Sequence, residues 1–154
     1  MELAIPNKGL YDFRYLVLDY NGTLATDGEI SEQVLQRLDG LSESFKIYIL
    51  SADTHGTLRE KLKGKPYEVR VVSSDQGQKE KGDFVEGLGA QHVIAIGNGN
   101  IDIQMFEKAA LSIGIMGKEG IATKAILYTE LIVGHIEEAL DLLLYPKRLI
   151  ATLR

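Results

Sequence analysis

The stretch that decides the fold is YLVLDYNGTL, at residues 15–24. Its apolar first half predicts a buried strand that ends at Asp19, and Gly22 predicts a tight turn directly after that strand. A carboxylate at the end of a strand can attack phosphorus when a cation neutralises the charge between them, and backbone N–H groups of the turn can face phosphoryl oxygens. Asp19 is therefore a candidate nucleophile. The same residues also suit a structural role, in which Asp19 starts an Asx turn and Gly22 supplies a positive φ angle.

Short strand-like runs alternate with helical patterns along the rest of the chain, which predicts a parallel sheet covered by helices on both faces. We expect strands at 15–19, 46–50, 68–72, 92–96 and 111–116. We expect helices at 31–41, 54–63, 79–88, 101–110 and 136–144. Residues 3–5 and 10–13 could form a hairpin that leads into the first core strand. Since the sequence contains no repeat, low-complexity tract or linker, we expect one doubly wound α/β domain over residues 1–154.

Composition narrows the possible functions. The 154 residues are 45% hydrophobic and 25% charged, which suffices for one sizeable core. The net charge of -5 and the lack of long Lys/Arg runs argue against a nucleic-acid surface, and the absence of cysteine excludes disulfides and thiol catalysis. The first residues do not resemble a signal peptide, and no apolar run approaches membrane-spanning length. We therefore expect a soluble, cytoplasmic protein with no nucleic-acid or membrane partner.

Ligands of doubly wound folds lie beyond the carboxyl ends of the strands, so the residues after each strand are candidates for a site. Ser51 follows the second core strand, and its hydroxyl could hold a phosphoryl oxygen with nearby backbone N–H groups. It could equally cap a helix, a role for which Asp53 and Thr54 compete. Lys81 stands near the start of a predicted helix, where its ammonium could neutralise a nucleophile or a phosphate, or could be ordinary surface charge.

The fourth strand end carries the sequence GNGNID at residues 97–102. Asn98 and Asp102 lie four residues apart at a Gly-rich turn that enters a helix, and together they offer amide and carboxylate oxygens to a hard cation such as Mg²⁺. Asp102 alone also suits the first turn of a helix, where the helix dipole favours negative charge. The conjunction of four such strand ends is what favours a functional site.

This ordered set resembles the four motifs of the haloacid dehalogenase-like (HAD) phosphohydrolase superfamily. The resemblance extends from about residue 15 to about residue 116. It implies a Rossmannoid three-layer α/β/α sandwich with a mostly parallel central sheet. Residues 18–25 and 51–54, with the closing segments 141–144 and 149–154, resemble a subgroup described as soluble P-type-ATPase-like proteins. That likeness implies no ion transport, because the chain has no apolar segment long enough to cross a membrane.

The resemblance implies a role for each candidate residue, with Asp19 as the group that is phosphorylated. The phosphoryl group would be held by Gly22, Ser51, Ala52 and Lys81. Mg²⁺ would be held by Asp19, the backbone carbonyl of Asn21, and Asp102, with Asn98 helping directly or through water. Lys79 is the alternative to Lys81, because the preceding loop leaves the register open by about two residues. Phosphoryl transfer depends mostly on positioning and neutralisation of charge, which these groups can supply.

Three residues depart from the pattern of the superfamily. One is Ile101, which stands where the transport-ATPase pattern frequently has an Asn, and this removes a possible hydrogen bond to the site. Asn21 stands where the superfamily's hydrolases commonly have a second Asp that protonates the leaving group and activates water, and an amide cannot exchange a proton in this way. Turnover should therefore be slow, since loss of one general acid/base costs about 10²- to 10⁴-fold. Asp27 and His55 are alternative acid/base groups, although Asp27 also fits an Asp-Gly turn and His55 the exposed start of a helix. Asn98 replaces an Asp of many relatives, which should weaken Mg²⁺ binding.

The spacing of the motifs leaves no room for the cap domain that often selects the substrate in this superfamily. An open site suggests a bulky substrate, or a homo-oligomer in which neighbours cover one another's sites. The basic tail at residues 145–154 could reach such a neighbouring site or pack on its own subunit or an interface. Two functions remain. One is a Mg²⁺-dependent phosphohydrolase or phosphotransferase that acts on a phosphorylated substrate, and the other is a non-hydrolytic phosphate-binding or regulatory module, which Asn21 and Asn98 favour.

Overall fold

The computed structural model of the protein describes residues 1–52 and 57–154. Its main sheet has six strands, all parallel, in the order β5-β4-β3-β6-β7-β8. The strands are β3 (Tyr15–Asp19), β4 (Lys46–Ser51), β5 (Tyr67–Val71), β6 (Val93–Gly97), β7 (Leu111–Ile115) and β8 (Leu131–Val133). The chain builds the sheet outward from β3 to β5 and then returns to β6 on the other side of β3. The switch point between β3 and β6 is where such a sheet places its ligand.

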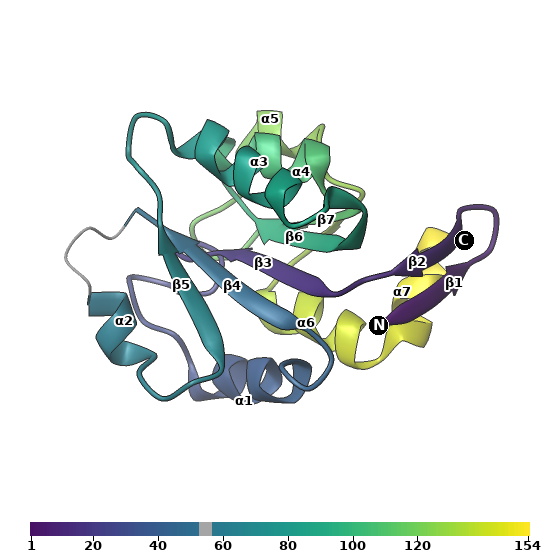
Figure 1. Cartoon of the computed structure of the whole chain (residues 1–154), viewed down its shortest axis with the longest axis horizontal. Helices are drawn as coiled ribbons and strands as arrows, with labels where there is room; N and C mark the ends of the chain where they lie inside the picture. Colours follow the sequence, from purple (N-terminus) through teal and green to yellow (C-terminus); the bar gives the residue numbers. More distant parts are fainter. Residues whose placement is uncertain (53–56) are drawn as a thin grey trace.

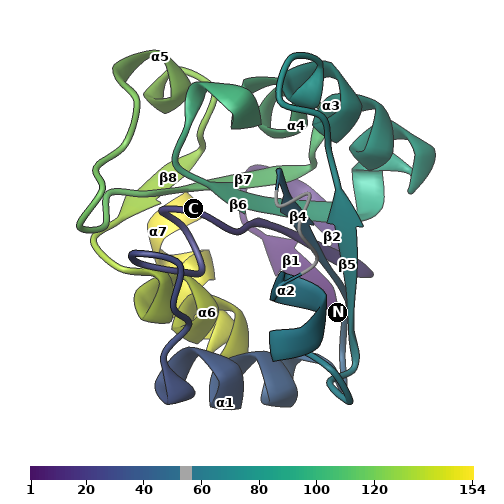
Figure 2. The same cartoon turned by 90° about the vertical axis from the view of Figure 1, so that its left-hand side faces the viewer.

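Helices cover both faces of the sheet, as Figures 1 and 2 show. One face carries α1 (Glu32–Leu41), α2 (Thr57–Lys61), α6 (Ile136–Leu144) and α7 (Pro146–Leu153). The other carries α3 (Gly77–Gly87), α4 (Ile103–Lys108) and α5 (Thr123–Ile126). Short 3-10 turns, Ala90–His92 and Asn100–Asp102, precede β6 and α4. The expected three-layer α/β/α sandwich with a parallel central sheet is confirmed.

The two faces of β3 explain where its last side chain points. Leu16 and Leu18 belong to the hydrophobic cluster that includes residues of α1 and α6, whereas Val17 packs with residues of α3 and α4. Because side chains alternate along a strand, Asp19 projects on the same face as Val17. This is the face that α3 covers, and α3 carries Lys81.

The expected N-terminal hairpin forms from β1 (Glu2–Ile5) and β2 (Gly9–Asp12). It contacts α7, and Leu3 and Ile5 share the core cluster with Leu149 of that helix. Since β2 runs directly into the start of β3, the hairpin lies at the amino ends of the strands, away from the end of β3 that carries Asp19 (Figure 1).

Several boundaries differ from the sequence-based expectation. The strand predicted at 92–96 is Val93–Gly97, because His92 belongs to a 3-10 turn. The strand predicted at 68–72 is Tyr67–Val71, one residue earlier, and the strand predicted at 111–116 is Leu111–Ile115, one residue shorter. The helix predicted at 101–110 is a 3-10 turn followed by α4, which ends at Lys108, and α3 starts two residues before its predicted start. The helix predicted at 54–63 appears as α2, with residues 54–56 outside the described residues.

The segments that follow β3 and β4 leave the carboxyl end of β3 without a cap domain. In the described residues, the segment between β3 and α1 consists of turns, and the segment between β4 and α3 holds α2 and β5, so neither forms a cap domain over the end of β3. Over the same described ranges, no helix combines the length and the apolar character that crossing a membrane requires.

Candidate active site

Three charged side chains meet at the carboxyl end of β3, on the face covered by α3. Lys81 Nζ donates hydrogen bonds to Asp19 Oδ1 at 2.5 Å and to Asp102 Oδ1 at 2.7 Å. Asp19 is 7% exposed, Lys81 1% and Asp102 0%. Charged side chains are rarely buried to this extent, and burying them is costly even when they are paired. A cluster of this kind at the switch point of the sheet is a strong candidate for a functional site.

Backbone N–H groups fix the position of Asp102. Its Oδ2 accepts hydrogen bonds from the N–H groups of Asn98 (3.0 Å) and Gly99 (2.9 Å). Gly97 makes this approach possible, because a Cβ at position 97 would lie 2.5 Å from Asp102 Oδ2. The Gly-rich sequence after β6 therefore folds back on a carboxylate and aims its other oxygen at Lys81.

The turn that follows β3 is held by its own backbone; we call residues 19–25 the Asp19 turn. The N–H of Gly22 donates to the carbonyl of Ala25 (3.0 Å), and the N–H of Ala25 donates to the carbonyl of Tyr20 (2.9 Å). Gly22 has a φ of +75°, as expected, and a Cβ there would lie 2.5 Å from Asn98 Nδ2. The turn thus needs glycine both for its conformation and for its contact with the loop after β6.

Thr23 is part of the cluster, although the sequence analysis assigned it no role. Its buried Oγ1 lies 3.1 Å from Asp19 Oδ2 and 3.2 Å from Asn98 Oδ1, and the hydroxyl can donate to either oxygen. Asn98 Nδ2 in turn donates to the carbonyl of Gly120 at 3.0 Å. Both ends of the Asn98 amide therefore have protein partners, which join the Asp19 turn to the loop after β7.

The buried charges shift one another's protonation. Burial raises the pKa of Asp19 to about 7, the charge of Asp102 adds to this effect, and Lys81 and Thr23 oppose it. Burial lowers the pKa of Lys81, but the two carboxylates raise it by more, so that the net pKa lies above its ordinary value. Lys81 is therefore charged at neutral pH. Two carboxylates that share one ammonium leave the cluster with a net negative charge when both are ionised.

The remaining candidate residues lie around this cluster. Lys79 is exposed and pairs with Asp83 at 2.5 Å, so the lysine that reaches Asp19 is Lys81. Ser51 is buried at the end of β4, where its carbonyl accepts from the N–H of Val72. Asn21 and Ala52 are exposed at the rim. Of the other residues considered, Asp53, Thr54 and His55 lie outside the described residues.

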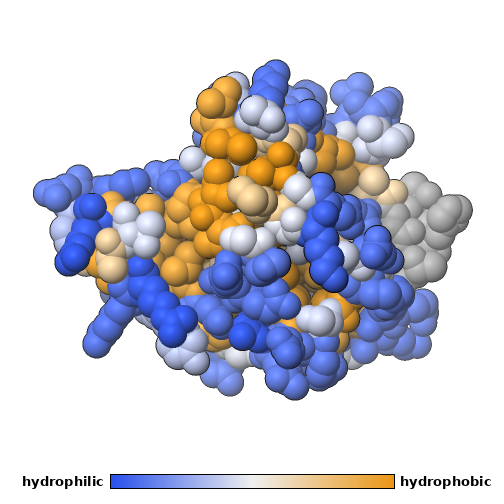
Figure 3. Space-filling model, turned by 180° about the vertical axis from the view of Figure 1, so that it is seen from behind, coloured by the Kyte–Doolittle hydropathy of each residue, from blue (hydrophilic) through white to orange (hydrophobic). Residues whose placement is uncertain are grey.

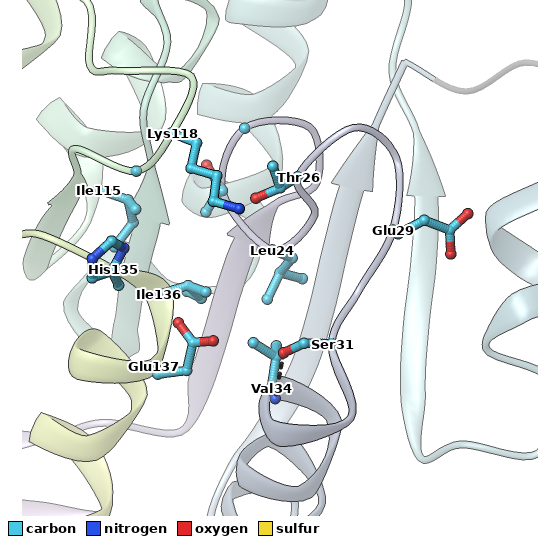
Figure 4. A pocket seen from close by; sticks show the side chains of 13 residues that line it. Leu24, Thr26, Glu29, Ser31, Val34, Ile115, Lys118, His135, Ile136 and Glu137 are labelled. Carbon is cyan, nitrogen blue, oxygen red and sulfur yellow. Dashed lines mark hydrogen bonds between the residues drawn. The ribbon is translucent and has the colours of Figure 1, made fainter.

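Two hollows flank the Asp19 turn. The first, which we call the side groove, has a volume of about 500 Å³ and is lined by Tyr20, Asn21, Asp27, Gly28, Glu29, Ala52 and Lys61. The second is a cavity of about 250 Å³ whose side chains come from the Asp19 turn, α1, the loop after β7 and the start of α6 (Figure 4). Leu24, Val34 and Ile136 of this cavity belong to the core cluster on the face opposite Asp19. The side groove contains Asn21 and Ala52, and the cavity contains Gly22 and Thr23, so both hollows adjoin the Asp19 turn.

The donor set of the cluster fits a hard divalent cation. Within residues 1–52 and 57–154, no group of three or more acidic or histidine side chains forms a complete metal cage. Mg²⁺ does not need such a cage, because it usually keeps several waters and binds one or two carboxylates. Asp19 and Asp102 supply two carboxylates with a net negative charge, which is the chemistry that such an ion requires.

Comparison with known sequences identifies relatives in one organism. No protein-family model matches the chain. Uncharacterized protein MJ0073 of Methanocaldococcus jannaschii is 48% identical over 62 residues, which are 40% of this chain and 67% of that protein. Uncharacterized protein MJ0072 of the same organism is 62% identical over 39 residues, which are 25% of this chain and 89% of that protein. The chain belongs to the same family as these two proteins.

Comparison with solved structures identifies the fold. The cobalt-bound deoxy-D-mannose-octulosonate 8-phosphate phosphatase of Haemophilus influenzae matches with a TM-score of 0.72 and 14% identity, over 87% of this chain and 88% of that chain. The Moraxella catarrhalis 3-deoxy-D-manno-octulosonate 8-phosphate phosphatase, in complex with magnesium, phosphate and KDO, matches with a TM-score of 0.71 and 17% identity, over 92% and 94% of the two chains. A proposed HAD superfamily (subfamily III A) hydrolase of Legionella pneumophila matches with a TM-score of 0.72 and 13% identity, over 92% and 87%. The protein therefore has the fold of the HAD superfamily hydrolases.

Proposed function

We propose that this chain, which has the HAD fold, is a divalent-metal-dependent phosphohydrolase or phosphotransferase that acts on a phosphorylated substrate through an aspartyl phosphate on Asp19. The observation that carries the proposal is the buried cluster of Asp19, Lys81 and Asp102 at the switch point of the sheet. Such a cluster costs stability. Its placement at the end of β3, beside an open groove, supports a functional role for these buried charges.

The chemistry assigned to the chain's own residues is a displacement at phosphorus. A carboxylate oxygen of Asp19 forms the new O–P bond while the bond between phosphorus and the leaving oxygen breaks, and the leaving oxygen takes the electron pair. Lys81 neutralises charge beside Asp19, and Ser51, with the backbone at Gly22 and Ala52, would hold the phosphoryl oxygens. Positioning and preorganised charge of this kind account for most of the catalysis in phosphoryl transfer.

A divalent cation, which we propose to be Mg²⁺, would be held by Asp19, the backbone carbonyl of Asn21, and Asp102. Asn98 would contribute through water, because both ends of its amide already have protein partners. When bound, the ion supplies neutralisation of the negative charge that otherwise keeps a phosphate away from Asp19. The absence of an acidic group at Asn21 should make hydrolysis slow, by about 10²- to 10⁴-fold relative to a site with an acid/base residue.

The proposal is tested by time-resolved phosphate release from acetyl phosphate with Mg²⁺. This donor has an activated leaving group, so it needs little help from an acid. We expect a burst followed by a slow phase in the native protein, and loss of both phases in Asp19→Asn. Asp83→Asn is the matched control, because Asp83 is an exposed carboxylate that pairs with Lys79 on the surface of α3. Equal release by the native protein and Asp19→Asn would refute the proposal.

A second candidate function is a non-hydrolytic phosphate-binding or regulatory module. Asn21 and Asn98 favour it, because each places an amide where hydrolases of the superfamily commonly have a carboxylate. Such a module would bind beryllofluoride tightly in the presence of Mg²⁺ and would turn over no substrate. Hydrolysis gained in Asn21→Asp would show that the rest of the pocket is competent, and would favour the enzyme.

A further inference from the structure

We propose that Glu119, in the loop between β7 and α5, is a specificity-determining residue of the proposed active site. Its carboxylate lies beside the Asp19 turn, where it attracts a leaving group that carries a positive charge and repels one that carries a negative charge. The inference rests on the proposed function and deepens it, because it names the substrate class: phosphate monoesters of alcohols that also carry an amine.

Two contacts place the carboxylate of Glu119. The N–H of Asp27 donates to its Oε1 at 3.3 Å. A Cβ added at Gly22 would lie 3.0 Å from its Oε2, so this second oxygen lies against the Asp19 turn. Gly22 lines the cavity and Asp27 lines the side groove, so Glu119 lies between the two hollows that adjoin the turn. A leaving group attached to phosphorus at Asp19 would therefore come close to this carboxylate whichever hollow it entered.

The loop that carries Glu119 is held on both sides of this residue. After it, the carbonyl of Gly120 accepts from Asn98 Nδ2 at 3.0 Å. Before it, the N–H of Gly117 donates to the carbonyl of Gly134 at 2.8 Å. Gly120 has a φ of +77°, a conformation that suits glycine. The backbone of the loop thus positions the carboxylate before a substrate binds.

The charges of the side groove leave a negative excess beside the Asp19 turn. Glu29 is neutralised by Lys61, whose Nζ lies 2.6 Å from Glu29 Oε1. Asp27 and Gly28, with φ angles of +53° and +77°, form the Asp-Gly turn that the sequence suggested. Within the part of the chain that the structure describes, neither Asp27 nor Glu119 has a cationic partner. Two carboxylates without a cation therefore lie on this side of the turn.

The charges of the cavity do not offset this excess. Lys118 and Glu137 carry opposite charges, and both side chains extend toward the cavity (Figure 4). His135 also lines it and adds no charge in its neutral form. Glu119 therefore makes the surroundings of the leaving group negative on the cavity side as well.

The expected selectivity follows from the interaction of single charges. Two unit charges about 4 Å apart in water change an affinity by about fivefold, and the factor grows where water is excluded. Glu119 forms no bond to the substrate and transfers no proton, so the displacement at phosphorus by Asp19 is unchanged. Its effect is confined to which leaving group is accepted.

Three phosphate monoesters of equal length test this selectivity, because they differ only in the charge at the far end. These are 2-aminoethyl phosphate, which is cationic there, 2-hydroxyethyl phosphate, which is neutral, and carboxymethyl phosphate, which is anionic. Each is added with Mg²⁺ as a competitor of the acetyl phosphate burst, and its inhibition constant is measured. In the native protein we expect the amine to bind most tightly and the carboxylate most weakly, with steps of about fivefold.

Three variants separate the charge of Glu119 from its structural contact. Glu119→Gln keeps an oxygen that can accept from the N–H of Asp27 and should lose most of the discrimination. Glu119→Lys should reverse the order of the amine and the carboxylate. Glu107→Gln is the control, because Glu107 is an exposed carboxylate near the end of α4, close in sequence to the start of β7, and its order should be the native one.

Equal inhibition by the three compounds in the native protein would overturn the inference, and so would a native order that persists in Glu119→Gln. Either result would leave the proposed function intact as long as the burst itself depends on Asp19. By contrast, a native protein that gives no burst from acetyl phosphate would fail the proposed function itself, and the role of Glu119 with it.

Discussion

At the scale of single residues, the site depends on Asp19, whose ionised form is disfavoured by burial. Asp19 is almost fully buried, and its partner Lys81 is shared with Asp102. In the absence of a bound cation, folding therefore favours the protonated form of Asp19. The same burial that prepares the residue for phosphoryl chemistry makes it sensitive to pH.

This pH sensitivity can be measured. The pKa of Asp19 rises from its ordinary value of 3.8 to about 7, chiefly through burial, so the folded state holds the proton more tightly than the unfolded state. The stabilisation from this group is fully present below about pH 4 and is lost as the pH rises through 7. We expect the free energy of unfolding of the native protein to fall relative to Asp19→Asn between pH 4.5 and 8, by on the order of 3 kcal/mol.

Chemical denaturation of both proteins with a chelator present measures this difference. Titrating groups that do not contact Asp19 contribute equally to the two proteins, so their contributions cancel in the comparison. A difference in stability that is constant over this pH range would show that Asp19 ionises normally in the folded protein.

At the scale of elements, the turn between β6 and α4 holds Asp102 through a close approach that excludes any side chain at position 97. We expect Gly97→Ala to displace Asp102, since the added Cβ would lie 2.5 Å from its Oδ2 and 2.9 Å from Met105 Cε. Activity should fall by at least about tenfold, which corresponds to about 1.4 kcal/mol of lost transition-state stabilisation.

Gly87→Ala is the matched control for this substitution. It lies at the end of α3, where an added Cβ meets nothing within 4 Å, and the change should be neutral or slightly stabilising. Phosphate release and thermal unfolding of both variants provide the comparison. Unchanged activity in Gly97→Ala would mean that the turn adapts, and that the approach of Asp102 is not required.

The strands β3, β4 and β6 could be predicted from the sequence because each is mainly a run of apolar residues. In β5, aromatic and β-branched residues alternate with Glu68 and Arg70, which is also typical of a strand. By contrast, β8 and α5 have three and four residues, too few for a periodic pattern. The sequence analysis assigned no helix to the tail. Pro146 occupies the first turn of α7, where its missing N–H costs nothing.

The candidate site was predictable in part, because the motifs mark strand ends but do not give contacts. The choice between Lys79 and Lys81 depended on where α3 begins. The helix starts at Gly77, so Lys81 shares the buried face with Gly77 and Val85, and Lys79 faces solvent. Thr23 could have been found only from the way the turn folds back on Asp19, which no sequence spacing shows.

At the scale of the whole molecule, the two edges of the sheet differ in character. The β5 edge carries Glu68 and Arg70, which pair with each other, and charged edge strands resist association. The β8 edge has the sequence Leu-Ile-Val, and Ile132 is 37% exposed. Apolar residues also gather on the face of the molecule seen in Figure 3. We propose that a second copy of the chain covers the β8 edge, in line with the homo-oligomer expected for an open site.

Substitutions at the two edges test this proposal. We expect the native protein to self-associate, and Ile132→Lys to shift it to a monomer by placing a charge on the contact. Val71→Lys is the control, because Val71 is similarly exposed (42%) on the β5 edge, and its association should match that of the native protein. Light scattering after size exclusion reports the mass of each. A native protein that stays monomeric, or a Val71→Lys variant that dissociates as readily, would contradict the proposal.

The central claim of the account is that Asp19 becomes phosphorylated. It is tested most directly by mixing the protein with acetyl phosphate and Mg²⁺, quenching in acid within the burst, and mapping the added mass by peptide mass spectrometry. The account predicts the mass of one phosphoryl group on the peptide that contains Asp19, absent in Asp19→Asn and absent without a divalent cation. A phosphoryl group found on another residue, or none at any time while phosphate is being released, would contradict it.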